Sequence, residues 1–446
     1  MQVTETAAAG LKREYRVVVP ATDLEARVNE RLDDLKDRVQ LRGFRPGKVP
    51  VAHLKRIYGK SAMAEVIDAA VREANDKIVS EHGFKLATEP KVVLPKEEGA
   101  VEGVIAGTSD LDYTVEMEIV PPIALTDFKT MKLERLTADV TDVEIDQALQ
   151  AIAEQNRPFA AKAEGAEKGD RVTISFQGTI DGEPFEGGSA EDIAMVLGSG
   201  RFLPGFEDNL IGLQSGESRT FELKFPDDYP ASAIAGKQAT FAVTAKTVEA
   251  PAPLTLDDDF AKSLGLDSLA KLRDALRERI QREHAATSRQ KLKRALLDQL
   301  DERHKFEPPP SLVEQEFTNV WSAIENDLKQ GGRTFADEGT SEEKARADYR
   351  AIAERRVRLG LVIAEVGEKN NITVSEEQLR AAVVEQVRQL PGREQQVWDY
   401  YRNNPGALAA LRAPLFEDKV VDFVVELAEV TEKKVSREEL FKEDAE

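Results

Sequence analysis

The chain has 446 residues, a formal net charge of -21 and no cysteine. The length predicts about three domains, and the missing cysteines exclude disulfides, thiolate metal sites and cysteine nucleophiles. An acidic chain is repelled by bulk nucleic acid, so we expect no DNA binding. The N-terminus lacks the basic and apolar regions of a leader peptide, and no apolar run approaches the ~20 residues of a membrane span. We therefore expect a soluble, cytoplasmic protein without a membrane partner.

A helix, a loop and a second helix are predicted near the N-terminus. Residues 22–25 have the form of a capping box, and apolar residues then recur at helical spacing as far as Val39. Ser61 can cap a second helix whose apolar residues continue to Ile78. Two glycines and two prolines lie within residues 43–50, and such residues end helices. This stretch should therefore be an exposed loop.

The loop lies in a basic stretch of an otherwise acidic chain. Residues 36–60 carry eight basic side chains and one acidic side chain. Phe44 and Arg45 lie at the tip of the loop, where burial gives an aromatic ring no reward. One interpretation is a solvated helix-loop-helix with ordinary surface cations. The exposed ring, the glycines and prolines around it and the contrast in charge favour a docking loop for an anionic surface.

The pattern Gly43-Phe44-Arg45-x-Gly47-x-x-Pro50 resembles the ribosome-docking signature of the bacterial trigger factor family. The resemblance implies that this loop docks beside the exit tunnel for nascent chains, against a ribosomal protein and rRNA. Phe44 would be the apolar anchor and Arg45 the group that pairs with anions. Pro46 stands where the family commonly has lysine, so Arg42 and Lys48 would supply compensating cations. The expected ribosome-binding residues are Arg42, Gly43, Phe44, Arg45, Pro46, Gly47 and Lys48.

The next elements are a strand and a connecting segment. Polar and apolar residues alternate over residues 111–119, which predicts a strand at the edge of a small α+β domain. Pro121 and Pro122 end this strand. Residues 123–150 then hold a short extended segment and a helix opened by the capping box at residues 141–144. We expect this stretch to be a connecting arm.

From about residue 159 the sequence favours β structure. Apolar and polar residues alternate over residues 172–176, 221–225 and 241–243. The dipeptide at residues 181–182, Asp-Gly, is a signal for a hairpin turn. Two prolines close the block. The pattern predicts a curved antiparallel sheet or half-barrel.

Several ordered segments of this block resemble the FKBP-type prolyl isomerase family. The longest is Phe-Leu-Pro-Gly-Phe-Glu from Phe202 to Glu207. Shorter matches begin at Phe176, Phe185 and Ala235. Because the segments occur in the same order as in the family, together they support the resemblance more strongly than any one of them alone.

This second resemblance implies an apolar pocket that binds an X-Pro bond. Phe206 would form the floor, and the Leu203 N–H and Tyr229 O–H would donate hydrogen bonds to the substrate carbonyl. Glu186 would be the acid beside the pocket, and Ile193 stands at a position that is often aromatic in the family. The expected site residues are Phe176, Phe185, Glu186, Ile193, Phe202, Leu203, Phe206, Tyr229 and Phe241.

Such a pocket accelerates isomerisation without a nucleophile or an acid-base pair. The barrier of roughly 18 to 20 kcal/mol comes from amide resonance. A twisted amide has lost this resonance and is less polar, so an apolar and water-poor pocket favours it over the planar amide. The alternative is that these phenylalanines are only the core of a small barrel. The density of apolar residues in the loop at 202–206 favours a cleft.

No cofactor or metal is expected. The four histidines, His53, His82, His284 and His304, are isolated in the sequence and belong to no metal-binding motif. The chain also lacks a phosphate-binding loop, a dinucleotide fingerprint and a serine nucleophile elbow. ATP-dependent, redox and hydrolytic chemistry are therefore unsupported.

The block from residue 255 onward is helical by its periodicity, and residues 375–378 form another capping box. An apolar helical stripe is usually part of a core. Here the helices are long, charged and poor in large aromatics, which favours an open, arm-like structure. The resemblance to the trigger factor family implies a cradle with two arms. Such a cradle would bind nascent and unfolded polypeptides over scattered apolar patches.

We predict a multidomain α+β protein in four parts. These are an N-terminal α+β ribosome-docking domain at 1–112, a connecting arm at 113–150, an FKBP-like antiparallel β half-barrel with a short helix at 151–249, and an all-α chaperone domain at 250–446. The predicted function is an ATP-independent, ribosome-associated chaperone that also isomerises X-Pro bonds. The alternatives are a cytosolic FKBP-type isomerase with adaptor domains and no ribosome docking, and a non-catalytic scaffold that binds proline peptides. A weak homodimer of the protein off the ribosome is a further partner that the sequence allows.

Overall fold

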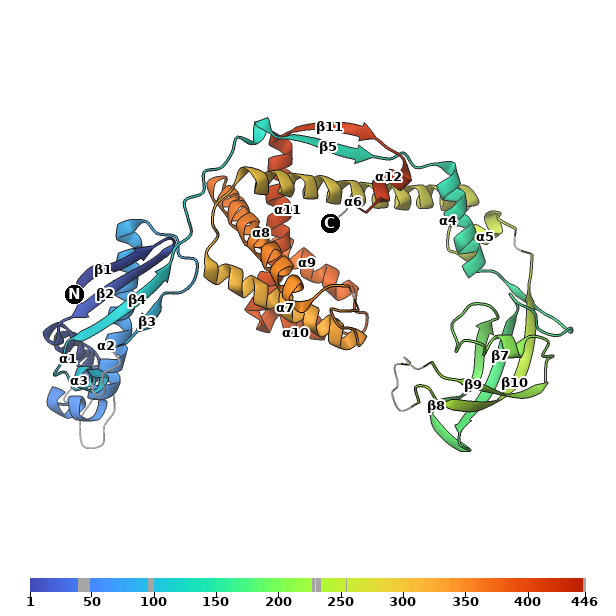
Figure 1. The fold of residues 1–446 in the computed structure, drawn as a ribbon, viewed down its shortest axis with the longest axis horizontal. Helices are drawn as coiled ribbons and strands as arrows, with labels where there is room; N and C mark the ends of the chain where they lie inside the picture. Colours follow the sequence, from blue (N-terminus) through green and yellow to red (C-terminus); the bar gives the residue numbers. More distant parts are fainter. Residues whose placement is uncertain are drawn as a thin grey trace. The chain divides into compact units, whose positions relative to one another are not determined.

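The computed structural model describes residues 1–38, 49–94, 100–226, 229, 234–253, 255–337 and 339–443. The chain forms two compact units. The first combines Met1–Arg135 with Gln290–Glu432, and the second combines Leu136–Arg289 with Lys433–Glu446. Each unit therefore brings together segments that lie far apart in the sequence, as the colours of Figure 1 show.

The N-terminal part of the first unit contains a four-stranded antiparallel sheet with the strand order β1-β2-β4-β3. The strands are β1 (Gln2–Ala9), β2 (Lys12–Val19), β3 (Lys91–Val93) and β4 (Leu111–Glu118). β4 confirms the strand predicted from the alternation of residues 111–119. Its Leu111, Tyr113 and Val115 are buried, and they point to one face because strand side chains alternate.

Helices pack on the buried face of this sheet. They are α1 (Ala21–Arg38), α2 (Val51–His82) and α3 (Ala100–Ile105). The predicted caps at Thr22 and Ser61 are wrong, because α1 already begins at Ala21 and α2 at Val51, each directly after a proline. Leu54 in the first turn is fully buried in the same core as Leu24 of α1, so tertiary packing extends the helix toward its N-terminus. The expected ribosome-binding residues Arg42 to Lys48 lie outside the described residues.

The rest of the first unit is mainly helical, as predicted. Its helices are α7 (Pro310–Gly331), α8 (Glu342–Lys369), α9 (Glu376–Arg388), α10 (Glu394–Asn403), α11 (Pro405–Leu427) and the C-terminal end of α6 (Leu269–Arg303). The predicted capping box is present, because the Gln378 N–H donates to Ser375 Oγ over 3.2 Å and the Ser375 N–H donates to Gln378 Oε1 over 3.0 Å. Leu296, Val362 and Val424 are fully buried where these helices meet.

A two-stranded ribbon joins this helical region; its first strand confirms the short extended segment predicted within residues 123–150, but its second strand and their pairing were not predicted. It consists of β5 (Lys132–Thr137) and β11 (Glu429–Lys434). The Glu429 N–H donates to the Met131 carbonyl over 2.9 Å, and Met131 is fully buried in the helical core. The ribbon therefore holds the end of the helical region against a segment from the middle of the chain.

The second unit contains the predicted antiparallel sheet. Its strands are β6 (Phe159–Ala161), β7 (Arg171–Ile180), β8 (Glu183–Val196), β9 (Ser218–Lys224) and β10 (Gln238–Pro251). β7 pairs with β8 on one side and β10 on the other, and β10 also pairs with β9 and β6. The short helix of this block is the 3-10 helix η2 (Asp208–Leu210).

Helices complete the second unit. They are α4 (Asp142–Gln155), α5 (Asp258–Ser263), α12 (Arg437–Phe441) and the N-terminal part of α6. The predicted capping box opens α4, because the Glu144 N–H donates to Thr141 Oγ1 and the Thr141 N–H donates to Glu144 Oε2. Ile145 and Leu149 of α4 and Leu276 of α6 are buried in one core. α4 and α6 therefore form a packed pair.

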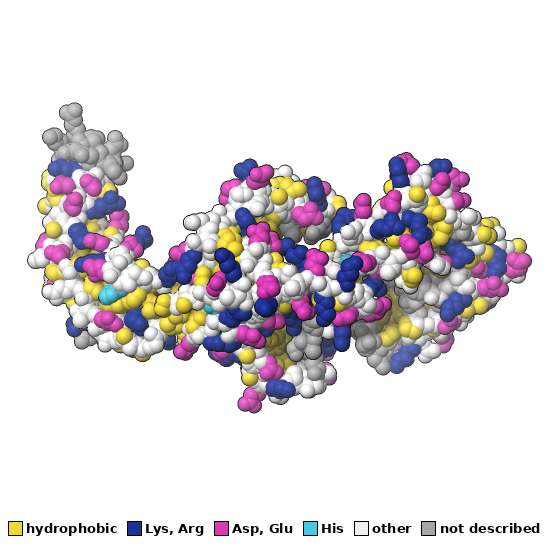
Figure 2. All heavy atoms as spheres, turned by 90° about the horizontal axis from the view of Figure 1, so that it is seen from above, with side chains coloured by type: hydrophobic (Ala, Val, Ile, Leu, Met, Phe, Trp, Pro, Cys, Tyr) yellow, Lys and Arg dark blue, Asp and Glu magenta, His cyan; other side chains and the backbone are white. Residues whose placement is uncertain are grey.

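Charged side chains of both signs are interspersed over the face that Figure 2 shows. Such mixing prevents a large electrostatic field of one sign over this face, although the chain carries a net charge of -21. Over the described ranges, no helix has an apolar stretch of the length that a bilayer crossing requires. The same ranges hold no group of three or more His, Cys, Asp or Glu side chains placed to bind a metal ion.

Candidate functional site

The hairpin of β7 and β8 supplies four of the expected site residues, Phe176 on β7 and Phe185, Glu186 and Ile193 on β8. Its turn has positive φ at both central residues, 51° at Asp181 and 87° at Gly182, as the predicted hairpin signal requires. In the sequence, Gly178 of β7 lies between Phe176 and Phe185. A Cβ at Gly178 would lie 2.7 Å from the ring of Phe241 and 3.0 Å from the ring of Phe185, so glycine allows both rings to pack on the backbone.

Phe206 is the centre of the aromatic cluster. Its ring is 2% exposed and meets the rings of Phe221 and Phe241 edge to face at centroid distances of 5.3 Å each. Phe176 approaches edge to face at 5.8 Å, and Phe202 stacks on Phe206 at 5.4 Å. Aromatic pairs at these separations add stabilisation beyond their buried area. Phe206 thus lies where a pocket floor is expected, with more exposed rings beside it.

Burial divides the expected site residues into two groups. Phe206 and Phe241 are buried, so they belong to the core as well as to any pocket. The partly buried residues that pack on this core include Phe176, Phe185, Ile193, Phe202, Leu203 and Tyr229. The structure therefore brings these eight residues together around one core. Glu186 belongs to β8, but its side chain lies outside the described part of the structure.

Two further aromatic residues complete the cluster. Phe221 lies opposite Phe241 on the neighbouring strand, and Phe225 meets the rings of Phe185 at 5.8 Å and Tyr229 at 4.9 Å. The sequence pattern predicted both phenylalanines only as residues of a strand. Phe221 lies on β9, and Phe225 directly follows this strand. A spacing of four residues in an extended segment places both side chains on one face, and this signal could have added them to the site.

The loop before Phe206 presents a free backbone donor. The Phe206 N–H donates to the Leu203 carbonyl over 2.9 Å, which closes a turn around Pro204 and Gly205. Within the part of the chain that the structure describes, the Leu203 N–H donates to no acceptor. An unengaged N–H beside an apolar surface can bind a carbonyl oxygen of a ligand.

Glu207 holds the loop that leads to this donor, and sequence reasoning missed this role. Its Oε2 accepts the N–H groups of Gly198 at 2.6 Å and Gly200 at 3.2 Å. Its Oε1 accepts the Ser199 hydroxyl and the Arg201 N–H, each at 3.1 Å. Burial alone would raise the pKa of Glu207, but these hydrogen bonds favour the carboxylate more strongly and hold its pKa below the usual value.

Glu207→Gln should loosen the loop and slow any reaction that uses Leu203. A carboxamide has one oxygen, so two of the four donors would face an NH2 group. This should lower the unfolding free energy by about 1–3 kcal/mol. Because the folded pKa of Glu207 is depressed, the difference from wild type should be fully present above about pH 5 and shrink as pH falls below ~4. Urea unfolding of the full chain at several pH values measures this difference.

Glu217→Gln is the matched control for this prediction. Glu217 is an exposed carboxylate in the next turn and accepts one backbone N–H, from Gln214 at 2.9 Å. Its replacement should change the unfolding free energy by less than about 1 kcal/mol. If the two variants were equally stable at neutral pH, Glu207 would not hold the loop.

In a comparison with known proteins, models of protein families match most of the chain. Residues 1–152 match the model "Bacterial trigger factor protein (TF)", and residues 268–426 match "Bacterial trigger factor protein (TF) C-terminus". Residues 162–246, which contain the aromatic cluster, match "FKBP-type peptidyl-prolyl cis-trans isomerase".

Full-length relatives agree with these models. The Trigger factor of Afipia carboxidovorans is 58% identical over 446 residues, which are 100% of this chain and 99% of that protein. The Trigger factor of Azorhizobium caulinodans is 59% identical with the same coverage. A solved trigger factor chaperone structure covers 96% of this chain and 99% of that chain at a TM-score of 0.57 and 19% identity, which shows a shared fold.

Proposed function

The chain belongs to the trigger factor family and is a chaperone with an FKBP-type peptidyl-prolyl isomerase domain, and from this premise we propose that it docks on ribosomes beside the exit tunnel and receives nascent chains there. Its partners would be the exit-tunnel protein, neighbouring rRNA and unfolded polypeptides, in the cytoplasm. In this proposal residues 1–112 dock, 113–150 connect, 151–249 isomerise and 250–446 hold clients.

The aromatic cluster around Phe206 is the observation that carries the isomerase site. The half-buried rings of Phe176 and Phe202 beside it offer a ligand an apolar surface. An X-Pro amide that is twisted has lost its resonance and polarity, so it gains more from this surface than the planar amide does. The Leu203 N–H binds the substrate carbonyl and holds one side of the bond while the other rotates. No covalent bond forms, and no proton moves.

The two helices that flank the docking loop support the ribosome contact. α1 is described as far as Arg38 and α2 begins at Val51, so the predicted loop lies between two described helices in the sequence. Ion pairs join these helices, from Arg27 to Glu73 at 2.6 Å and from Arg31 to Glu65 at 2.8 Å. In the proposal, the paired helices present the loop, Phe44 enters an apolar site on the ribosomal protein, and Arg45 binds carboxylate or phosphate oxygens.

Exposed apolar side chains in the helical region support client binding. Leu390, Trp398 and Tyr400 are 48%, 39% and 56% exposed. Trp398 and Tyr400 lie on α10, which has no buried residue in the described structure. Large exposed apolar side chains can bind apolar segments of an unfolded chain.

Assays of the purified full chain separate the proposed function from its alternatives. It should suppress aggregation of a denatured protein without ATP and accelerate a refolding step limited by proline, which takes ~10–100 s unassisted. If refolding is not accelerated while a proline peptide still binds, the protein is a binding scaffold. If both activities are present but the chain never sediments with ribosomes, it is an isomerase with adaptor domains.

A further inference from the structure

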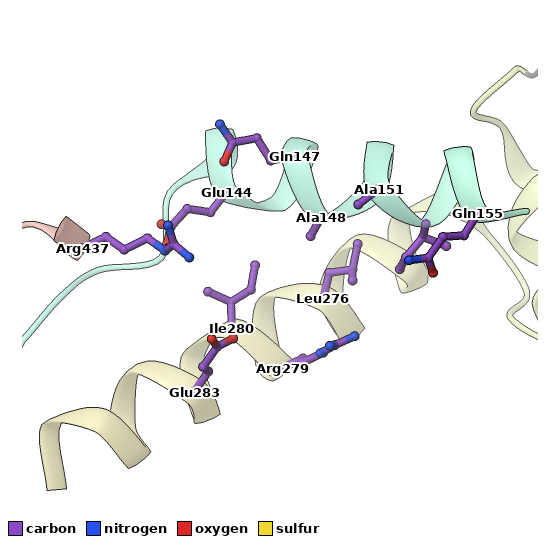
Figure 3. A pocket seen from close by; sticks show the side chains of 11 residues that line it. Glu144, Gln147, Ala148, Ala151, Gln155, Leu276, Arg279, Ile280, Glu283 and Arg437 are labelled. Atoms are coloured by element: carbon purple, nitrogen blue, oxygen red, sulfur yellow. The ribbon is translucent and has the colours of Figure 1, made fainter. Parts of the chain in front are cut away.

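A groove runs between α4 and α6 in the second unit and is built from residues outside the isomerase sheet. Its volume is about 360 Å³. Ala148 and Ile152 of α4 and Leu276 and Ile280 of α6 form its apolar floor, and Figure 3 shows both helices contributing side chains to it. Leu276 is buried, whereas Ile152 and Ile280 are partly buried, so part of the floor still faces solvent.

The rim of the groove carries four polar side chains. Gln147 and Gln155 come from α4, and Arg279 and Glu283 come from α6. All four are exposed, and none has a hydrogen-bond or ion-pair partner among the described residues. The rim therefore has free donors and acceptors directly above an apolar floor, which is the arrangement of a binding site rather than of a closed core.

The end of the groove holds charged side chains that already face one another. The Glu144 carboxylate lies 3.2 Å from Arg437 Nε and 3.0 Å from His284 Nε2. On the rim, one cation at Arg279 balances one anion at Glu283. The groove is thus locally neutral in a chain with a net charge of -21, and it favours a neutral occupant over a strongly acidic or basic one.

The dimensions of the rim fit a short extended peptide. Gln147 and Gln155 are eight positions apart, or about 12 Å along a helix. An extended chain covers this length with about four residues at ~3.3 Å each. A carboxamide offers both donors and an acceptor, and a peptide backbone offers one N–H and one C=O at each residue. The floor between the rims suits one or two branched aliphatic side chains.

We propose that this groove is a client-binding subsite for an extended, neutral segment of unfolded polypeptide that carries branched aliphatic side chains. The inference rests on the proposed function in one respect, namely that unfolded chains are the ligands of this protein. It adds a place where clients bind on α4 and α6, outside the isomerase sheet, without any need for a proline.

A single introduced cysteine tests the site, because the chain has none of its own. Ala151 lines the groove and is exposed, whereas its neighbour Gln150 is exposed but does not line it. Ala151→Cys and Gln150→Cys would each be labelled with an environment-sensitive fluorophore. The probe is a proline-free nonapeptide of glycine and serine with two isoleucines separated by one residue, and the comparison peptide has serines in their place.

The isoleucine peptide should shift the emission of the dye at position 151 and saturate, at least tenfold more tightly than the serine peptide. The dye at position 150 should not respond. Ala151→Trp, which fills the groove, should weaken binding of the fluorescein-labelled isoleucine peptide at least fivefold, whereas Gln150→Trp should leave it within twofold of wild type. Equal binding by the two tryptophan variants would overturn the inference.

The same preparations distinguish failure of this inference from failure of the proposed function. If wild type suppresses aggregation and accelerates refolding but the dye at position 151 stays silent, the groove is not a client site and the proposed function stands. If wild type shows neither activity, the proposed function fails. A saturating response at position 151 alone would then still support a peptide-binding groove.

Discussion

Phe206→Ala should lower the catalytic efficiency of proline isomerisation by roughly 10- to 150-fold and leave the suppression of aggregation intact. Burial of a phenylalanine side chain contributes ~1.5–3 kcal/mol, and a difference of 1.36 kcal/mol in a barrier changes a rate tenfold. The ring of Phe206 contacts those of Phe176 and Phe202, so its loss also removes the support of the exposed rings beside it. Refolding of a proline-limited protein at increasing chaperone concentration measures the effect.

Controls must separate catalysis from stability, because Phe→Ala in a core costs about 3–5 kcal/mol. Phe206→Leu keeps most of the volume and should retain a folded sheet with reduced activity. Phe317 is a matched site in the first unit, since it is also a buried phenylalanine, at 7% exposure. Phe317→Ala should leave isomerisation unchanged. Unchanged isomerisation by folded Phe206→Ala would contradict the assigned floor, and loss of both activities would contradict two separate sites.

Local signals explain which parts of the fold the sequence predicts. The capping boxes at Thr141 and Ser375 and the turn at Asp181 depend on residues within four positions of each other, and all three are present. Each acts through hydrogen bonds or backbone geometry of its own segment. Ser61 shows the limit of this reasoning, because burial of Leu54 against α1 determines where α2 begins.

Elements that depend on distant partners were not predicted. β1 and β2 form a sheet with β4, about a hundred residues further along the chain, and Gln2–Ala9 is almost wholly exposed. β11 is charged along most of its length, and its pairing with β5 gives it no buried face. β1 and β11 lack the alternation that marks a half-buried strand, so their partners determine their conformation. β2 does alternate, with Tyr15, Val17 and Val19 buried at every second position, and this signal could have predicted it.

The residues of the candidate site also divide into those that local sequence signals predict and those that depend on the folded structure. Its aromatic residues were predicted because a resemblance and the apolar density of one loop both pointed to them. The role of Glu207 was not predicted, because the sequence marks it only as the last residue of the segment that resembles the FKBP-type family and does not show that its carboxylate holds the preceding loop. Only the folded loop brings four donors to its two oxygens. Positioning residues of this kind depend on loop geometry, which hydrophobic periodicity does not encode.

The double variant Phe44→Ala, Arg45→Ala should weaken ribosome binding by about two to four orders of magnitude. Loss of the apolar anchor removes ~1.5–3 kcal/mol, and loss of a cation that pairs with a charged group removes ~1.5–3 kcal/mol more. Co-sedimentation with bacterial ribosomes over a salt series measures both contributions. Wild-type binding should fall steeply as salt rises, and loss of one phosphate contact should reduce the slope by about 0.7–0.9.

The control for this prediction removes the same kinds of group from a described helix beside the loop. Ile57 is 49% exposed and Lys60 is exposed, and both lie on α2 within the same basic stretch. Ile57→Ala, Lys60→Ala changes the net charge by the same amount, so it accounts for general electrostatic attraction. It should weaken binding less than tenfold. Equal weakening by both double variants would make the contact a diffuse basic patch rather than an anchored loop, and failure of wild type to sediment even at low salt would favour the isomerase with adaptor domains.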